Sequence, residues 1–135
     1  MSRSLSAFLN PIKVENEFVV VSKRFIEDGE PIKWEIKAIT SAENDMLLKK
    51  NTKRDAKKGI ETFDRVAYQN DLMVASVVYP DLHNAELQES YGVLGASQLL
   101  GKMLTLGEAT TLGIEIKRIS GLDDDEEDLV EQVKN

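Results

Sequence analysis

The sequence predicts a single-domain α+β fold in which an N-terminal antiparallel β-hairpin packs against a mainly helical C-terminal two-thirds. Between Ile32 and Ala38, apolar residues alternate with charged ones, as in a strand that has one buried face. From residue 64 onward, apolar residues instead recur every three or four positions, which is typical of amphipathic helices. At 135 residues the chain is long enough to bury one hydrophobic core.

Composition narrows the class of protein. The formal net charge is −7, yet residues 49–58 hold six cations and one acid, so the remainder of the chain carries −12. This acidic balance disfavours general nucleic-acid binding, because like charges repel phosphate. The lack of cysteine excludes disulfides and thiolate metal sites. No apolar run is long enough for a membrane span, and no signal-peptide core follows Met1, so we expect a cytoplasmic protein.

The first third of the chain predicts a short helix and two strands. Leu5, Phe8 and Leu9 share one face of a helix that Pro11 stops, and this face must dock on the core or on another copy of the chain. Residues 18–21 form a β-branched run that favours a strand. Turn residues at 27–31 connect it to the alternating strand, and helices should cover the Trp34 face of this hairpin.

A capping box formed by Thr40 and Glu43 predicts a helix through residues 46–48. The basic stretch at 49–58 follows and is broken by Gly59. We interpret this stretch as a solvated helix end and loop, with lysines near the negative end of the helix dipole. A contact for an acidic partner or for phosphate stays open as the alternative.

The next predicted helix runs from Arg65 to Tyr79, is capped by Asp64, and should be the most buried helix because nearly every position from 72 to 79 is apolar. Three valines near its end leave a strand open as the alternative. Pro80 ends the element in either case.

Residues 80–108 predict a packed helical corner around which the chain is organised. Asn84 caps a first short helix, Gly92 ends it, and Gly95 opens a second helix. Apolar pairs recur at helical spacing in the second helix, at Leu99, Leu100, Met103 and Leu104. Thr105 and Glu108 then form a capping box for a third helix.

That third helix should run from Gly107 to about Ser120 and bury a stripe formed by Ala109, Leu112, Ile116 and Ile119. Gly113 inside it predicts a close packing contact, and Gly121 is a candidate C-cap. We place a domain at 1–121 and an acidic C-terminal tail at 122–135, where Leu122, Leu129 and Val133 can share a helical face.

No residues form a recognisable catalytic or cofactor-binding motif. His83 is the only histidine, and its acidic neighbours fit an ordinary surface better than a metal site or a general base. Gly92-Val93-Leu94-Gly95 matches the G-x-x-G loop of KH domains, but it lacks a basic residue to clamp phosphate. We therefore predict no enzyme, no metal and no cofactor, and we interpret the two glycines as a helix–turn–helix corner.

The chain resembles the XkdN-like tail assembly chaperones of Bacillus-type phages and prophages. The resemblance is carried by Asp64 and Tyr68 and by residues 77–108, above all Pro80-Asp81-Leu82, Leu87-Gln88-x-Ser90-Tyr91-Gly92 and Leu99-Leu100 through Gly107-Glu108. Residues 4–9 and 36–40 resemble the same family, and we expect the acidic tail to lie outside it. The resemblance implies a non-enzymatic protein of the host cytoplasm, absent from the finished virion. It also implies binding of the tape-measure protein, which is kept soluble until the tail tube assembles, with the tail-tube protein as a second candidate partner.

An exposed apolar surface would suit such a role, and the candidate partner-binding residues are Leu87, Tyr91, Val93 and Leu94. Their burial in the core is the alternative. Two other functions stay open: a nucleic-acid-binding module that uses Gly92–Gly95 and the 49–58 basic stretch, and a structural tail protein retained in the particle. Self-association also stays open.

Overall fold

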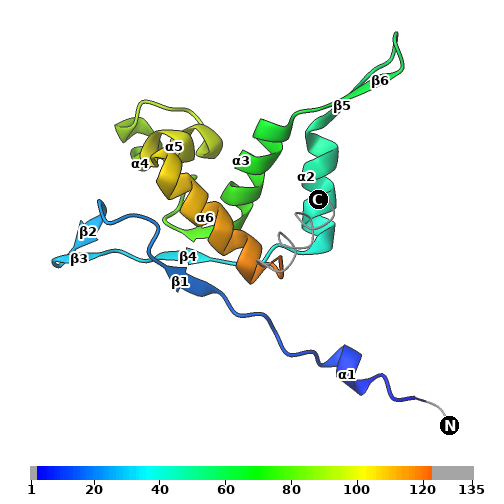
Figure 1. Ribbon diagram of the computed structural model, residues 1–135, viewed down its shortest axis with the longest axis horizontal. Helices are drawn as coiled ribbons and strands as arrows, with labels where there is room; N and C mark the ends of the chain where they lie inside the picture. The colour runs from blue at the N-terminus through cyan, green and yellow to red at the C-terminus, as the bar shows by residue number, and fades with distance from the viewer. Residues whose placement is uncertain (1–2, 123–135) are drawn as a thin grey trace, which may run out of the picture.

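The computed structural model describes residues 3–122 and shows helices packed on one side of a small antiparallel sheet (Figure 1). The predicted α+β class is confirmed. In chain order the elements are α1 (Ser6–Leu9), β1 (Glu17–Val19), β2 (Ile26–Glu27), β3 (Glu30–Pro31), β4 (Trp34–Ile36), α2 (Ser41–Lys50), β5 (Thr52–Asp55), β6 (Ile60–Phe63), α3 (Arg65–Ser76), β7 (Val77–Tyr79), α4 (Ala85–Ser90), α5 (Ala96–Met103) and α6 (Leu106–Ile119). The acidic tail and its predicted helical face lie outside the described residues, apart from Leu122.

The main sheet has the strand order β1-β4-β7, and both pairings are antiparallel. The predicted hairpin is confirmed: Val19 pairs with Trp34 and Glu17 with Ile36, while β2 and β3 form the predicted turn between the two strands. The third strand corrects the predicted helix to Tyr79. The β-branched Val77 and Val78 leave the helix after Ser76 and add an edge to the sheet.

Ser76 fixes the point where α3 becomes β7. Its hydroxyl donates to the carbonyl of Lys37 at 2.6 Å, and its own carbonyl accepts from the Lys37 N–H at 2.9 Å. Ser76 is completely buried, so these bonds satisfy polar groups that have no access to water.

The hydrophobic core lies between the sheet and helices α5 and α6. Trp34 and Ile36 on β4 are buried beneath Leu99 of α5 and Leu112 of α6. The predicted stripes are confirmed: the apolar pairs of α5 are buried, and so are Leu112, Ile116 and Ile119, with Ala109 partly buried. The expectation that the helix after Asp64 is the most buried was wrong, because only Ser76 of α3 is buried. That helix packs against α2, α5 and α6, and most of its residues are half-buried.

The local capping predictions are confirmed. Thr40 with Glu43 and Thr105 with Glu108 form complete capping boxes, and the Asp64 side chain accepts the Ala67 N–H. The Gly113 prediction was wrong: a Cβ placed there meets no atom within 4 Å, so no close packing contact occupies that side of α6.

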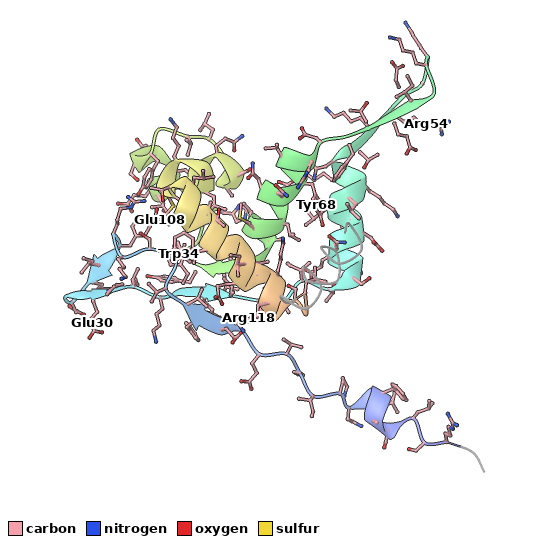
Figure 2. The ribbon with its side chains drawn as sticks, in the orientation of Figure 1. Glu30, Trp34, Arg54, Tyr68, Glu108 and Arg118 are labelled. Atoms are coloured by element: carbon pink, nitrogen blue, oxygen red, sulfur yellow. The ribbon has the colours of Figure 1, made fainter. Side chains whose placement is uncertain are left out.

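The basic stretch is not a helix end followed by a loop. Lys49 and Lys50 lie in the last turn of α2, as predicted, but the rest of the stretch forms β5 and the turn that leads to β6. Together β5 and β6 make a two-stranded ribbon that projects from the body, with Arg54 near its end (Figure 2). Gly59, at a φ of +65°, makes the turn. At the base of the ribbon, Asn51 is buried, and its amide donates to the Asp71 carboxylate at 3.0 Å. The ribbon therefore has a fixed base and a solvated outer part.

The predicted N-terminal helix exists but is only four residues long, and it stands apart from the domain (Figure 1). Every residue from 3 to 16 is exposed, so the apolar face of this helix does not dock on the core. We expected this face to dock either on the core or on another copy of the chain. The structure rules out the core, and the second alternative stays open.

Candidate functional site

The α4–α5 corner is built by local hydrogen bonds. The Asn84 side chain accepts the Leu87 N–H at 2.8 Å and so begins α4, as predicted. Gly92 has a φ of +69° and Gly95 a φ of +141°, conformations that side chains disfavour. The Gln88 side chain closes the turn: its amide donates to the Leu82 carbonyl at 2.8 Å, and its oxygen accepts the Gly95 N–H at 3.1 Å.

The four candidate partner-binding residues differ in how much of each side chain is exposed. Leu87, Tyr91 and Val93 are partly buried and pack against the core, so each offers only part of its surface. Leu94 is 96% exposed at the tip of the turn. Leu94 is therefore the one residue of this set whose whole side chain is available to a partner.

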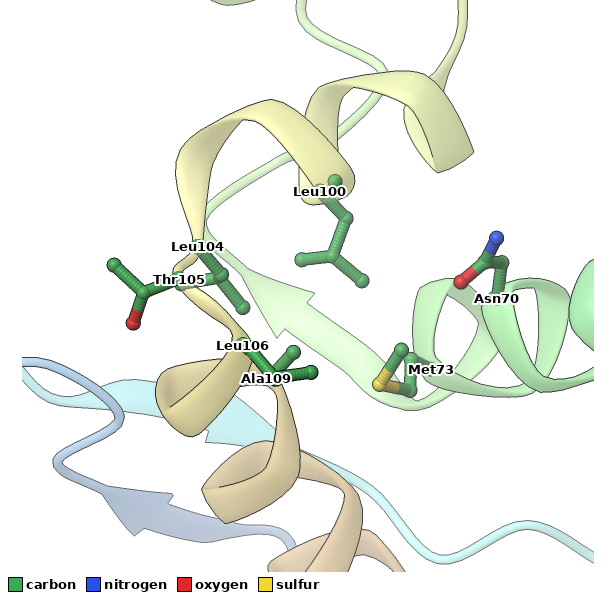
Figure 3. A pocket seen from close by; sticks show the side chains of 8 residues that line it. Asn70, Met73, Leu100, Leu104, Thr105, Leu106 and Ala109 are labelled. Atoms are coloured by element: carbon green, nitrogen blue, oxygen red, sulfur yellow. The ribbon is translucent and has the colours of Figure 1, made fainter.

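A pocket with a mixed polar and apolar lining lies at the other end of α5, where the sequence had not predicted one. Its volume is about 230 Å³, and it opens between α3, α5 and the start of α6 (Figure 3). The lining residues, which we call the α5 groove, are Asn70, Met73, Leu100, Gly101, Leu104, Thr105, Leu106 and Ala109. Small-molecule sites are commonly about 300–1,000 Å³. A cavity of this size instead suits one or two side chains of a partner, with Met73, Leu100, Leu104 and Leu106 as its apolar lining.

Two features of the α5 groove favour close approach by another chain. Leu106, the first residue of α6, lies at the edge of the groove and is 86% exposed. Its apolar side chain is therefore available for contact with a partner. Gly101 contributes no side chain, and the space where its Cβ would stand is open. Leu106 lies off the predicted buried stripe of α6, and this was the one signal in the sequence that pointed to the site.

An ion pair fixes the rim of the α5 groove to the β1–β2 connection. Arg24 donates through Nη2 to Glu108 Oε1 at 2.5 Å and to the Met103 carbonyl at 2.7 Å, while the Ser22 hydroxyl donates to Glu108 Oε2. The Thr105 N–H also donates to Glu108, at 2.8 Å. Hydrogen bonds from Arg24, then Ser22, then Thr105 hold the pKa of the Glu108 carboxyl well below its usual range. The connection between α5 and α6 is thereby held in one position.

The other candidate residues are spread over the surface. His83 is exposed, and its backbone N–H donates to Asp81 Oδ1 at 3.0 Å. Within residues 3–122, no three His, Asp or Glu side chains are grouped so that they could hold a metal ion. The α4–α5 corner, which holds the Gly92–Gly95 turn, and the β5–β6 ribbon lie on opposite sides of α3, so they do not form one nucleic-acid surface (Figure 1). Over the same residues, no helix is long and apolar enough to cross a bilayer.

Comparisons with known proteins agree with the resemblance noted in the sequence. A family model described as phage XkdN-like tail assembly chaperone protein matches residues 5–134. The match includes most of the acidic tail, which we had expected to lie outside the resemblance.

Two relatives from Bacillus subtilis (strain 168) align over 130 residues, 92% of this chain and 87% of theirs. The phage-like element PBSX protein XkdN is 32% identical, and the uncharacterized protein YqbN is 34% identical. A crystal structure of YqbN superposes with a TM-score of 0.74 at 26% identity, covering 91% of this chain and all of that one.

Proposed function

Because the chain belongs to the XkdN-like family of phage tail assembly chaperones, we propose that it binds the tail tape-measure protein and keeps it soluble during tail assembly. The role is one of holding, without a chemical step. It is carried out in the cytoplasm of the bacterial host, and the protein leaves before the virion is complete. The tail-tube protein is a second candidate partner, since the tube must replace the chaperone on its client.

One observation supports this proposal: the fold leaves two leucines exposed at the two ends of α5, Leu94 in the turn before it and Leu106 at the edge of the α5 groove. A long helical client presents apolar side chains at positions i, i+3 or i+4, and i+7. One or two of these side chains fill the α5 groove, where Leu106 and Gly101 let the client backbone come close. α5 has eight residues and so spans about 12 Å, or roughly two helical turns, between the α5 groove and Leu94.

The partly buried Leu87, Tyr91 and Val93 have a supporting part in this proposal. They pack against the core on either side of the turn that carries Leu94, and their exposed edges widen the contact. Loading an apolar client raises the risk of aggregation, and a net charge of −7 opposes it by keeping loaded complexes apart.

The experiment is co-expression of the tape-measure protein with four forms of this chain, followed by measurement of the soluble client. Gly101→Leu fills the α5 groove, and Leu94→Asp places a charge at the tip of the turn. Gly113→Leu is the matched control, because it makes the same change in a helix where a Cβ also meets open space, away from the α5 groove. Circular dichroism confirms that each variant is folded.

We expect wild type and Gly113→Leu to keep the client soluble and Gly101→Leu to lose most of this activity. Leu94→Asp should weaken it less, since a single side chain is affected. Equal client solubility with Gly101→Leu and Gly113→Leu would reject the α5 groove as the binding site. Insoluble client in the presence of wild type would reject the tape-measure protein as the partner.

A further inference from the structure

The N-terminal arm, residues 5–14, carries a large apolar surface that no other segment within residues 3–122 covers. Its large apolar side chains are 67–98% exposed, namely Leu5, Phe8, Leu9, Ile12 and Val14. The backbone N–H groups of residues 8–10 donate only to carbonyls within the arm, those of Leu5 and Ser6. An isolated helix as short as α1 is not stable in water. The arm therefore needs an apolar surface that holds it.

The base of the arm is fixed, and it directs the arm away from its own domain. Arg118 of α6 pairs with Glu17 at 3.1 Å, and the Asn16 amide donates to Glu35 at 2.8 Å. From these anchors the chain runs outward (Figure 1). Residues 11–15 contain no glycine that would ease a reversal toward the sheet. The arm is thus placed to reach another molecule more readily than its own sheet.

A matching apolar surface exists on the side of the main sheet opposite the helices. Trp34, Ile36 and Val77 occupy the covered side, whereas Phe18, Glu35 and Tyr79 form one row on the other. A bulge places Val78 beside Tyr79, opposite Glu35. We call the exposed apolar residues of this side the outer sheet face, and they are Phe18, Val20, Val78 and Tyr79, each 42–62% exposed.

We propose that the arm of one protomer packs on the outer sheet face of a second copy of this chain, giving an arm-exchanged homodimer. The arm and the outer sheet face adjoin at residues 16–18 of the same chain. A two-fold axis near that point lets the arm of each chain reach the outer sheet face of the other chain. This is the reciprocal arrangement of a symmetric dimer. Ten extended residues reach about 30 Å, enough to cross a three-stranded sheet about 10 Å wide.

The area available matches what a stable dimer needs. Each large apolar side chain of the arm offers on the order of 100 Å² to a partner surface. Two exchanged arms and the two surfaces that receive them then bury about 2,000 Å² in total, within the range of specific interfaces.

Charge favours self-association at this place over the rest of the surface. Two chains of net charge −7 repel each other, yet residues 4–12 contain no charged side chain. The centre of a stable interface is normally depleted of charge. Residues 4–12 therefore bring no charge into the contact, and Lys13 of the arm is opposite in sign to Glu35, which lies in the middle of the row on the outer sheet face.

Sedimentation equilibrium of the full chain tests the proposal, at concentrations from about 1 to 200 µM. Wild type should have twice the 15.1 kDa chain mass, and it should dissociate on dilution. The arm variant Phe8→Ser with Leu9→Ser and the face variant Val78→Lys should each weaken dimerisation at least tenfold. Met46→Ser is the control, since it removes a side chain that is also exposed (71%) but lies on α2, and it should leave the dimer intact. Circular dichroism checks the fold of each variant.

Mixing the arm variant with the face variant adds an internal check. One intact arm then meets one intact face, so a mixed dimer should form that neither variant forms alone. A monomeric wild type at every concentration would overturn the proposal, including the case in which its arm packs on its own sheet. An arm variant as dimeric as wild type would overturn it equally.

Discussion

Replacing Gly113 by alanine should stabilise the protein, the opposite of what a tightly packed glycine would give. Gly113 lies inside α6, and the space for a Cβ is free of atoms within 4 Å. Alanine lowers the conformational entropy of the unfolded chain and favours the helix, together worth about 1 kcal/mol. Gly101 in α5 has the same open space, so the same gain is expected there.

The size of the gain can be converted to a melting temperature. An unfolding entropy of about 2.1 cal/mol/K per residue gives a domain of this length a shift of roughly 4 °C for 1 kcal/mol. Thermal and urea unfolding of Gly101→Ala, Gly113→Ala and the double variant measure it. The two sites lie on different helices and share no neighbouring side chain at the Cβ, so the gains should add to about 2 kcal/mol. A loss of stability in Gly113→Ala would mean that a neighbour packs against the glycine and would refute this reasoning.

Three further predictions concern the core, the rim of the α5 groove and the basic ribbon. Leu99→Ala removes a completely buried side chain and should cost about 2–5 kcal/mol of unfolding free energy, measured in urea. Because the folded-state pKa of Glu108 is depressed, its stabilising effect is complete above the unfolded pKa of about 4.3 and fades as the pH falls below that value. Wild type should therefore lose more stability than Glu108→Gln between about pH 5 and pH 2, and parallel curves for the two proteins would contradict the role of the Arg24 pair. Lys57→Glu with Lys58→Glu should change stability by less than about 0.5 kcal/mol, because both side chains are solvated on the ribbon, and a larger loss would show that they support the fold.

The sequence was informative wherever structure is decided locally. The capping boxes at Thr40 and Thr105 depend on residues three apart, so both could be predicted with their partners. The alternation around Trp34 predicted a strand with one buried face, and the helical spacing in residues 99–119 predicted the faces that cover it.

The predictions that failed depend on contacts between distant residues. β7 becomes a strand because β4 offers it an edge, and this pairing overrides the helical spacing that continues past Ser76. The ribbon β5–β6 has no apolar alternation, so its register could not be predicted from a basic, polar stretch. The Arg24–Glu108 pair joins residues 84 positions apart, and the residue types alone do not show which arginine pairs with which carboxylate.

The candidate site was predicted only in part for the same reason. Val93 and Leu94 were chosen because they stand in a turn between two glycines, and of the two only Leu94 is exposed in the structure. The α5 groove could not, because Asn70 and Met73 come from α3 and meet Leu100 and Ala109 only after three helices have packed. Leu87, Tyr91 and Val93 have the same apolar character as Leu94, and the sequence alone did not separate partly buried residues from an exposed one.

Hydrogen exchange of the chain, alone and bound to the tape-measure protein, tests most directly whether the α5 groove holds the client. Backbone amides of residues 96–109, together with those near Met73, should exchange more slowly in the complex, while the β5–β6 ribbon keeps its free rate. Unchanged exchange across these residues, with new protection elsewhere in the domain, would show that the client binds at another surface.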